Sequence, residues 1–447
     1  MSEEKRPRAR RIATPSSAVR HGQIAPTSRR RSLLGVIGGG LAVVLIAVAS
    51  IAGIAFWDIA RSANAGIALA NDQKIPDIGA IEGGVNFLLV GSDSREGTDP
   101  GVFDEDPGST LNDVNIVLHI SADHTNATII SIPRDLVVRY PECPDVDGDG
   151  YGGGGWTGPI NASLNEGGLP CVVLTVEELT GLSIPFAAMI QFNGVIEMAN
   201  AVGGVEVCVA EPIEDEYTQT FLDAGMHTLS GLQALQFLRT RHGVGDGSDL
   251  GRISNQQVFL SSLVRKLKSA QTLTNPVALF GLAKAAISNM TLSNSLNSMD
   301  TMVSIAMALK DIPLENVVFI QYPGTTGGEG VYAGKVQPDQ AAADAIFAAI
   351  LADQPVGLSG GTGNGSVADP EAEAKAAAAA EAAAKEAAKA AKASPTPSTS
   401  SSASSSAAAQ PAEAATPAPT VAVLPDTVNG QTANDYTCSA GRTLDQQ

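Results

Sequence analysis

The longest hydrophobic stretch of the chain lies near its N-terminus. Residues Ser32–Trp57 form a run of 26 residues without a charged side chain. A transmembrane helix needs about 20 such residues, whereas the apolar core of a cleaved signal peptide has about 7–15. Three arginines at 29–31 precede the run, and Phe56 and Trp57 end it. Because basic residues stay inside and aromatic residues favour the interface, the pattern predicts one transmembrane helix with a cytoplasmic N-terminus.

Beyond residue 83, short apolar runs alternate with stretches of helical periodicity. The apolar runs predict strands at Val85–Val90, Val114–Ile120, Ala127–Ile132, Phe186–Phe192, Val205–Val209 and Val317–Tyr322. Helical spacing predicts helices at Val172–Thr180, Asn193–Val202, Leu229–Leu238, Ile253–Leu267, Val277–Ile287 and Gln337–Leu351. The expected helix caps are Asn193, Ser230 and Asp249. Because strands alternate with helices, the expected fold class is α/β, with one sheet covered by helices.

The composition changes after this region. Residues 356–366 are rich in Gly and Ser, and Ala with Glu and Lys then fills Glu371–Ala393 before a Ser/Pro/Thr tract. These compositions are typical of flexible and semi-rigid linkers. The last 27 residues regain Val, Leu and Tyr but are too few to fold alone. The expected order is a basic tail (1–31), a membrane helix (32–57), a stalk (58–82), a catalytic domain (83–355), a low-complexity linker (356–420) and a C-terminal segment (421–447).

The charge is distributed unevenly along the chain. The net charge is −19, but residues 1–31 hold nine basic and two acidic side chains, which leaves −26 for the remainder. A strongly acidic body excludes nucleic acid as the default partner, since nucleic-acid binding depends on basic surfaces.

All four cysteines follow the predicted membrane helix, in a compartment where disulfides form. They are Cys143, Cys171, Cys208 and Cys438. Four cysteines allow three pairings, and none of the spacings is that of a zinc site. Cys143 and Cys171 flank a Gly-rich insertion, so that a bridge between them would close the loop and leave Cys208 for Cys438.

The insertion begins like a calcium-binding loop. Asp145–Gly150 places acidic residues at positions 1, 3 and 5 and glycine at position 6. The twelfth residue is Trp156, where a calcium loop has a bidentate Glu. The pattern therefore favours an acidic insertion, with a calcium site as the alternative.

Acidic and basic residues gather at the ends of the predicted strands. Asp93 and Arg95 follow the first strand, at the position where open α/β sheets bind ligands. Asp113 opens the second strand, and Arg134 and Asp135 follow the third. Ordinary polar turns are not expected to gather acidic and basic residues at the ends of three strands.

A second basic group follows the helix at 229–238. Arg239 and Arg241 point the same way if the segment is extended, and paired guanidinium groups suit phosphate. A solvated basic helix end is the alternative. Arg252 and Gln256 lie one helical turn apart on one face. Arginines combined with two isolated Asp residues indicate an anionic ligand held with a hard cation such as Mg²⁺.

Taken together, and in their order along the chain, these motifs resemble those of the LytR-CpsA-Psr family of bacterial envelope proteins. The resemblance is to the form found in high-GC Gram-positive bacteria. The resemblance covers about residues 83–355 and the preceding membrane anchor, and it implies a central mixed sheet between helices. The segments that carry it are Gly91–Arg95, Asp113, Ser131–Asp135, Gly203–Val205, Leu229–Leu235, Arg239–Arg241, Arg252 and Gln256–Gln257.

The family transfers a glycopolymer from a polyprenyl pyrophosphate carrier to peptidoglycan. The resemblance therefore implies a glycopolymer–peptidoglycan phosphotransferase of the cell membrane, with an extracytoplasmic catalytic domain. Its partners would be the lipid-linked glycopolymer, peptidoglycan and the membrane, and the acceptor a muramic acid 6-hydroxyl. A non-catalytic, polyprenyl-pyrophosphate-binding envelope regulator is the alternative.

The resemblance also implies roles for individual residues. Asp93 and Asp113 would bind Mg²⁺, or Mn²⁺ in its place. Asp249 matches the family pattern, and either Asp135 or Asp113 could accept the proton of the acceptor. The pyrophosphate would be held by Arg95, Arg134, Arg239, Arg241, Arg252 and Gln256, with Arg134, Arg239, Arg241 and Asp135 as the catalytic set.

Two positions depart from the family pattern. Leu111 and Asn255 stand where members often carry Arg, which would reduce the positive charge of the site. No histidine is an obvious base, and His119 inside a strand is expected to be a core residue.

Overall fold

The computed structural model describes residues 66–69, 84–95, 110–144, 151–152, 154–269, 276–369 and 421–447, with isolated positions in 371–385. All of them belong to one compact unit, Ser62–Gln447. The predicted membrane helix at 32–57 and the calcium-like loop at 145–150 lie outside the described residues. Within the described ranges, every helix is too short or too polar to span a bilayer.

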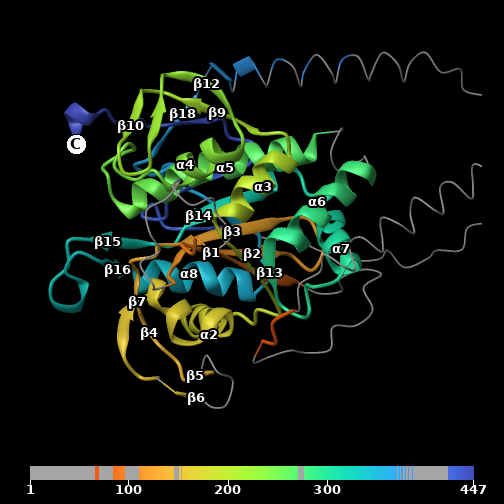
Figure 1. Cartoon of the computed structure of the whole chain (residues 1–447), viewed down its shortest axis with the longest axis vertical. Coiled ribbons are helices and arrows are strands. Elements are labelled where there is room, and N and C mark those ends of the chain that lie inside the picture. The colour runs from red at the N-terminus through yellow and green to blue at the C-terminus, as the bar shows by residue number, and fades with distance from the viewer. Residues whose placement is uncertain are drawn as a thin grey trace, which may run out of the picture. The chain divides into compact units, whose positions relative to one another are not determined.

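A seven-stranded mixed sheet forms the centre of the described unit (Figure 1). β1, β2 and β3 pair antiparallel, β8 and β14 pair parallel with β1 and β3, and β13 and β20 close the edges antiparallel. The mixed sheet and the α/β class are as predicted. In spatial order the strands are β13 (Met290–Leu292), β8 (Phe186–Ile190), β1 (Val85–Ser92), β2 (Asn112–Ile120), β3 (Ala127–Ile132), β14 (Val317–Gln321) and β20 (Gly430–Thr432).

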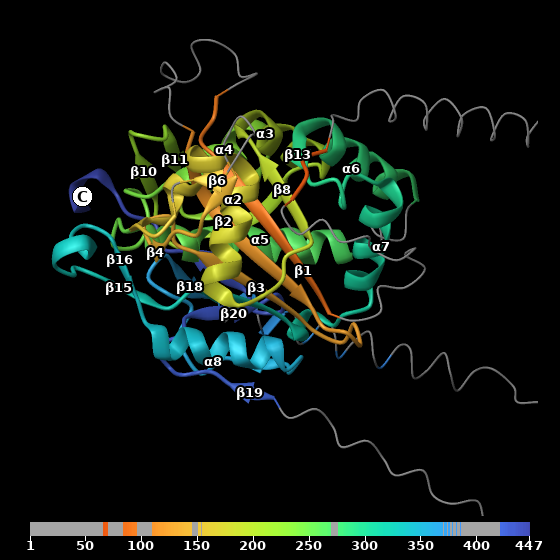
Figure 2. The same cartoon turned by 90° about the horizontal axis from the view of Figure 1, so that it is seen from below.

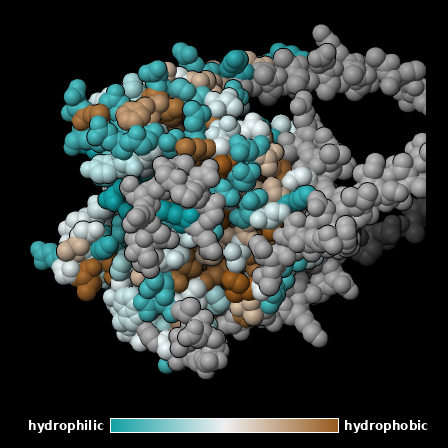
Figure 3. Space-filling view, viewed as in Figure 1, coloured by the Kyte–Doolittle hydropathy of each residue, from teal (hydrophilic) through white to brown (hydrophobic). Residues whose placement is uncertain are grey.

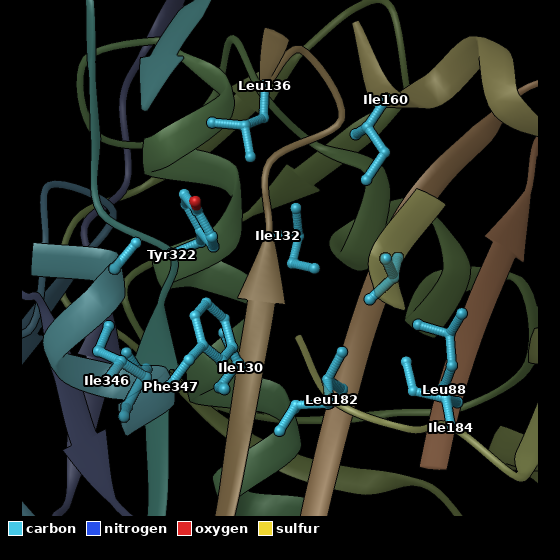
Figure 4. Close-up of a cluster of buried hydrophobic side chains, with 14 of the residues drawn as sticks. Leu88, Ile130, Ile132, Leu136, Ile160, Leu182, Ile184, Tyr322, Ile346 and Phe347 are labelled. Atoms are coloured by element: carbon cyan, nitrogen blue, oxygen red, sulfur yellow. The ribbon is translucent and has the colours of Figure 1, made fainter. Parts of the chain in front are cut away.

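Helices cover both faces of this sheet (Figures 1 and 2). The lower face in Figure 1 is covered by α2 (Ser163–Thr180) and α8 (Gln340–Leu351). Successive side chains of a strand alternate between the faces. Leu88 and Ile130 therefore pack into the core with residues of α2 and α8, and Figure 4 shows Ile130 near Phe347 of α8. The other face is covered by α3 (Phe192–Ala201), α4 (Gly231–Arg239), α5 (Asp249–Lys268), α6 (Pro276–Asn289) and α7 (Met299–Lys310).

A four-stranded sheet packs beyond α4 and α5 and has its own core. Its strands are β12 (Gly225–Leu229), β9 (Val205–Val209), β21 (Thr437–Ser439) and β18 (Ser366–Ala368). Two-stranded pairs are β4 (Val137–Arg139) with β7 (Thr157–Pro159), β5 (Cys143–Pro144) with β6 (Tyr151–Gly152), β10 (Ile213–Asp215) with β11 (Thr220–Leu222), β15 (Gly324–Thr326) with β16 (Val336–Pro338), and β17 (Val356–Gly357) with β19 (Ala422–Val423). Short 3₁₀ turns are η1 (Ile160–Ala162), η2 (Leu314–Asn316), η3 (Gly330–Tyr332) and η4 (Leu444–Gln446).

The surface over β10–β12 is mostly hydrophilic. Figure 3 shows a small group of hydrophobic residues among hydrophilic ones over this part of the unit. Tyr217, Phe221 and Met226 are the large hydrophobic side chains exposed in these strands and their turns.

The predicted helix at 172–180 is the second half of α2. The backbone is non-helical at Gly167 and Gly168, where φ is +65° at Gly168, a conformation that glycine adopts without steric cost. Pro170 follows, as is common near the start of a helix. Gly181 ends the helix in the left-handed conformation.

The three predicted caps differ from what the structure shows. Asn193 lies inside α3, which begins one residue earlier. Ser230 precedes α4 as expected, but its side chain makes no capping hydrogen bond. α5 is capped by Ser248, whose hydroxyl accepts a hydrogen bond from the backbone N–H of Gly251 at 3.1 Å. Asp249 is the first residue of α5, and its carboxylate is bound elsewhere.

The C-terminal segment at 421–447 is part of the folded unit. β20 forms an edge of the main sheet, β21 lies between β9 and β18, and β19 pairs with β17. Residues 356–357 and 366–368 are therefore in strands, and the prediction of a flexible linker is wrong for them. The local composition gave no sign of their pairing, because the partner strands come from the C-terminal segment.

Both predicted disulfides are present in the structure. Cys143–Cys171 joins β5 to α2, and Cys208–Cys438 joins β9 to β21. Their sequence separations are 28 and 230 residues.

Removing the longer cross-link should destabilise the fold. We expect Cys208→Ser with Cys438→Ser to lower the free energy of unfolding by about 2–4 kcal/mol, because the unfolded chain regains the entropy of an open loop. Chemical unfolding of the full chain measures this, with Cys143→Ser plus Cys171→Ser as the shorter-loop comparison. Unfolding of the first variant at the wild-type midpoint would contradict the expectation.

Candidate functional site

Backbone pairing brings the predicted strand-end residues together. Because β1 and β2 run antiparallel, the end of β1 meets the start of β2. Two hydrogen bonds between Asp93 and Leu111 connect these strand ends. The Asp93 backbone N–H donates to the Leu111 carbonyl at 3.1 Å, and Asp93 Oδ1 accepts from the Leu111 N–H at 2.7 Å. Leu111 thus contributes through its backbone at a position where family members often carry Arg.

Arg134 links three segments through three carboxylates. Its Nη1 lies 2.8 Å from Asp113 Oδ1, and its Nε lies 3.7 Å from Asp135 Oδ2. Its backbone N–H donates to Asp249 Oδ2 at 3.1 Å. Burial opposes the charge on Arg134, but Asp113, Asp249 and Asp135 outweigh it and raise the pKa. Arg134 therefore remains a cation in a partly buried position.

Arg252 fastens α5 to β2. Its Nη2 lies 2.7 Å from Asp249 Oδ1 and donates to the Asp113 carbonyl at 2.8 Å. Its Nη1 lies 4.0 Å from Asp113 Oδ2. The side chains of Arg252 and Asp249 are only 6 % and 2 % exposed, so each charge depends on its partner. The carboxylate predicted as a helix cap is instead part of this ion pair.

Arg239 ends α4 above an aromatic ring. Its guanidinium carbon lies 4.3 Å from the centroid of the Phe192 ring, a cation–π contact. Burial lowers the pKa of Arg239, and neighbouring charges act in both directions. In order of effect these neighbours are Asp113, Arg95, Arg252 and Asp93. Four of the predicted residues thus act electrostatically on Arg239.

Arg241 and Gln256 are held by backbone carbonyls. Arg241 Nε donates to the Gly247 carbonyl at 2.9 Å, and Gln256 Nε2 donates to the Leu238 carbonyl at 2.9 Å. Gln256 lines the cavity described below together with Arg239 and Arg252. Its amide therefore joins the end of α4 to α5 beside Arg239 and Arg252, which together with Arg134 we call the arginine group.

Asn255 connects α5 to α4 and to the C-terminal segment. Its Nδ2 donates to the Phe237 carbonyl at 2.9 Å, and its Oδ1 accepts from the Ser439 hydroxyl at 2.5 Å. The side chain is completely buried. This position joins α4 to the C-terminal segment, which accounts for an amide there in place of a charged group.

Lys335 is a site residue that the sequence patterns did not indicate. Its Nζ lies 2.8 Å from Asp135 Oδ1, and the Val336 N–H donates to the Asp135 carbonyl at 2.9 Å. The hairpin β15–β16 thereby brings a cation from 200 positions away. The role of Asp135 as proton acceptor stays a prediction, since its carboxylate is shared with Lys335 and Arg134.

A large apolar cavity opens beside the arginine group. Its volume is about 470 Å³, and it lies between the upper face of the main sheet and α3, α5, α6 and α7. Phe87, Leu89 and Leu118 belong to its walls. The polar side chains in its lining are Ser92, Asp113, Arg239, Arg252 and Gln256. Because Asp113 stands at the start of β2, the charged groups lie at the strand-end side of the cavity.

His119 is a core residue, as predicted. It is 7 % exposed, its Nδ1 lies 2.8 Å from Asn86 Oδ1, and burial lowers its pKa although Asp353 acts in the opposite direction. It stands near the end of β2 that is remote from Asp113.

The donor chemistry around Asp93 and Asp113 fits a hard cation. Among the described residues, no third acidic side chain clusters with them, and the one group that metal-ligand distances pick out contains two disulfide-bonded cysteines. Mg²⁺ commonly uses one or two carboxylates and completes its shell with phosphate oxygens and water. Two carboxylates that both act on Arg239 are compatible with that requirement.

Comparison with known proteins places this site in a family context. Cell wall biosynthesis protein LcpA of Corynebacterium glutamicum is 28 % identical over 320 residues, 66 % of this chain and 61 % of LcpA, so this chain spans less than two thirds of that relative. The probable cell wall biosynthesis protein LcpB of the same organism is 32 % identical over 329 residues, 72 % of each chain. TagT of Bacillus subtilis, named a polyisoprenyl-teichoic acid–peptidoglycan teichoic acid transferase, is 28 % identical over 249 residues, 53 % of this chain and 71 % of TagT.

The model of the LytR_cpsA_psr family matches residues 59–349. This range contains the arginine group, both aspartates and the cavity. The chain therefore belongs to the LytR_cpsA_psr family.

Proposed function

We propose that this chain is a phosphotransferase that attaches a glycopolymer from a polyprenyl pyrophosphate carrier to peptidoglycan, outside the membrane to which residues 32–57 anchor it. Family membership and the printed name of TagT support the reaction class. The observation that carries the proposal is the placement of an arginine group directly at an apolar cavity. This combination suits an amphiphile with an anionic head and a long hydrocarbon tail.

The cavity would take the tail of the carrier. Its lining is almost entirely aliphatic and aromatic, and a cavity of about 470 Å³ can enclose several isoprene units. Each buried methylene contributes about 0.8 kcal/mol by leaving water. The tail would therefore supply binding energy without a specific polar contact.

The arginine group would hold the pyrophosphate. Arg239 and Arg252 line the cavity, and Arg134 is oriented by Asp113 nearby. Burial and like charges depress the pKa of Arg239, so an arriving anion would restore a favourable field around it. Arg95, Arg241 and Gln256 would complete the set of pyrophosphate ligands.

Asp93 and Asp113 would hold Mg²⁺, or Mn²⁺, through carboxylate oxygens. When bound, the ion would neutralise negative charge on the phosphate oxygens. Arg134 and Arg252 restrain Asp113 by ion pairs, which would keep its carboxylate in place for this role.

The reaction needs alignment and charge stabilisation more than a covalent intermediate. The hydroxyl oxygen of the acceptor, a muramic acid 6-hydroxyl, would attack the phosphorus that carries the glycopolymer. The bond from that phosphorus to the bridging oxygen would break, and polyprenyl phosphate would leave. Arg239 and the neighbouring arginines would stabilise the charge that develops on the leaving group. Either Asp113 or Asp135 would take the proton.

The discriminating experiment is a search for product. The full-length chain in detergent is incubated with a lipid-linked oligosaccharide, peptidoglycan and Mg²⁺, and the digested wall is analysed by mass spectrometry. We expect an oligosaccharide linked to muramic acid through a phosphodiester. Binding of the lipid without any linked product would instead support the alternative, a non-catalytic envelope regulator.

Loss of either Arg239 or Arg241 should strongly slow transfer. We expect Arg239→Ala and Arg241→Ala to lower the transfer rate by about 10²–10³-fold, as for removal of a charge-stabilising donor. Arg→Lys should not restore it, because an ammonium lacks the planar pair of donors. Arg139→Ala, on the exposed end of β4, is the control. Wild-type rates in both site variants would refute the assignment.

The metal proposal is tested by the two carboxylates. Asp93→Asn with Asp113→Asn should abolish the EDTA-sensitive part of the activity and weaken Mn²⁺ binding measured by electron paramagnetic resonance. Asp123→Asn, in the turn between β2 and β3, is the control. Undiminished Mn²⁺ binding by the double variant would show that other residues hold the ion.

A further inference from the structure

Asp215 is a completely buried carboxylate that none of the roles above uses. It ends β10 and lies next to α4, as Figures 1 and 2 show for these elements. Its Oδ1 accepts hydrogen bonds from the backbone N–H groups of Tyr217 and Thr218 at 3.0 and 3.2 Å. Its Oδ2 accepts from the Thr240 hydroxyl at 2.7 Å and from the backbone N–H groups of Arg241, His242 and Gly243 at 3.1, 3.2 and 3.4 Å.

These donors stabilise the charged form. Burial by itself would raise the pKa of Asp215, but the hydrogen bonds from Thr240 and the backbone outweigh it and lower the pKa. A ring of backbone N–H groups around an anion is a known stabilising arrangement. Asp215 is therefore a fixed negative centre that gathers two separate segments.

One of these segments carries the arginines of the proposed site. α4 ends at Arg239, and Thr240 leaves the helix with φ −58° and ψ 133°. Residues 240–243 belong to no helix or strand. The Thr240 N–H still donates to the Gln236 carbonyl, and the Gly243 carbonyl accepts from the Arg442 N–H. The backbone N–H groups of 241–243 converge on Asp215, while Arg241 Nε binds the Gly247 carbonyl. The direction of the Arg241 side chain thus depends on a carboxylate more than twenty residues earlier.

We propose that Asp215 is a positioning residue for Arg241: by accepting hydrogen bonds from the Thr240 hydroxyl and from the backbone N–H groups of residues 241–243, it presents the guanidinium to the phosphate groups of the ligand. The identity of that ligand rests on the proposed function. Asp215 itself stays out of contact with the ligand and acts through the loop that it orders. A misplaced arginine would cost binding even in a correctly folded protein, since charge recognition depends on geometry.

Asp123 provides a matched control. Its carboxylate also orders a turn, since Oδ1 accepts from the Ser121 hydroxyl at 2.7 Å and from the Thr125 N–H at 3.0 Å. The turn between β2 and β3 lies at the end of the sheet opposite Asp113 and Arg134. Asp215→Asn and Asp123→Asn therefore make the same chemical change in two turns, of which only one adjoins the arginines.

The first readout is amide hydrogen exchange of the full-length chain in detergent, followed by mass spectrometry. Asp215→Asn should accelerate exchange in peptides that contain residues 217–218 and 240–243, whereas Asp123→Asn should do so only around 121–125. If Asp215→Asn does not fold, Thr240→Val removes one of its hydrogen bonds and should give a smaller change in the same peptides. Unchanged exchange at 240–243 overturns the proposal.

The second readout is a double-mutant cycle on binding of geranylgeranyl pyrophosphate, measured by calorimetry. Asp215→Asn should weaken binding by about tenfold or more in the wild-type background and have almost no effect in the Arg241→Ala background. A merely structural role would lower the fraction of active protein or give additive losses, and additive losses overturn the proposal. If the wild type does not bind this lipid, the proposed function fails, and the exchange result alone decides whether Asp215 orders the loop.

Discussion

The partly buried ion-pair network of Asp113, Arg134, Asp249 and Arg252 is the constraint on which the site depends. Removing charges from water costs several kcal/mol for each ion unless partners replace the solvent. Here each arginine meets two aspartates, with contacts of 2.7 and 2.8 Å at the centre. The network joins the start of β2, the end of β3 and the first turn of α5. It therefore sets the position of the helix that carries Gln256 and limits the motion of the strand ends at which ligands are expected.

The same sheet serves two purposes on its two faces. Leu88 and Ile130 face α2 and α8 in a filled core, while Phe87 and Leu89 face a cavity of about 470 Å³. Alternation along β1 makes both possible within one strand. The helices above the sheet leave this space open, and Arg239 of α4 stands in its lining. An apolar enclosure next to concentrated positive charge is the physical basis of the proposed affinity for a lipid pyrophosphate.

The C-terminal segment supports the helix behind the site. Ser439 donates to Asn255, and Gln431 Nε2 donates to the Gln257 carbonyl at 2.9 Å and lies 3.2 Å from the Ser261 hydroxyl. Asn255, Gln257 and Ser261 all lie on α5. β20 and β21 complete two sheets, and the disulfide to Cys208 holds the segment in place. A segment too short to fold alone thus acquires its structure from the body and stabilises it in return.

Local patterns in the sequence determined the central strands, most helices and the strand-end positions of Asp93, Asp113 and Arg134, because side-chain periodicity and chain breaks act over a few residues. They also favoured the two disulfide pairs, while the membrane helix stays a prediction. Only the tertiary structure decided that Lys335 reaches Asp135 and that Asp215 holds the loop of Arg241. It also decided that strands at 356–357 and 366–368 exist, because their partners lie far along the chain. Such contacts leave no local signature: they form when distant segments meet, and their hydrogen bonds and charges are then satisfied together.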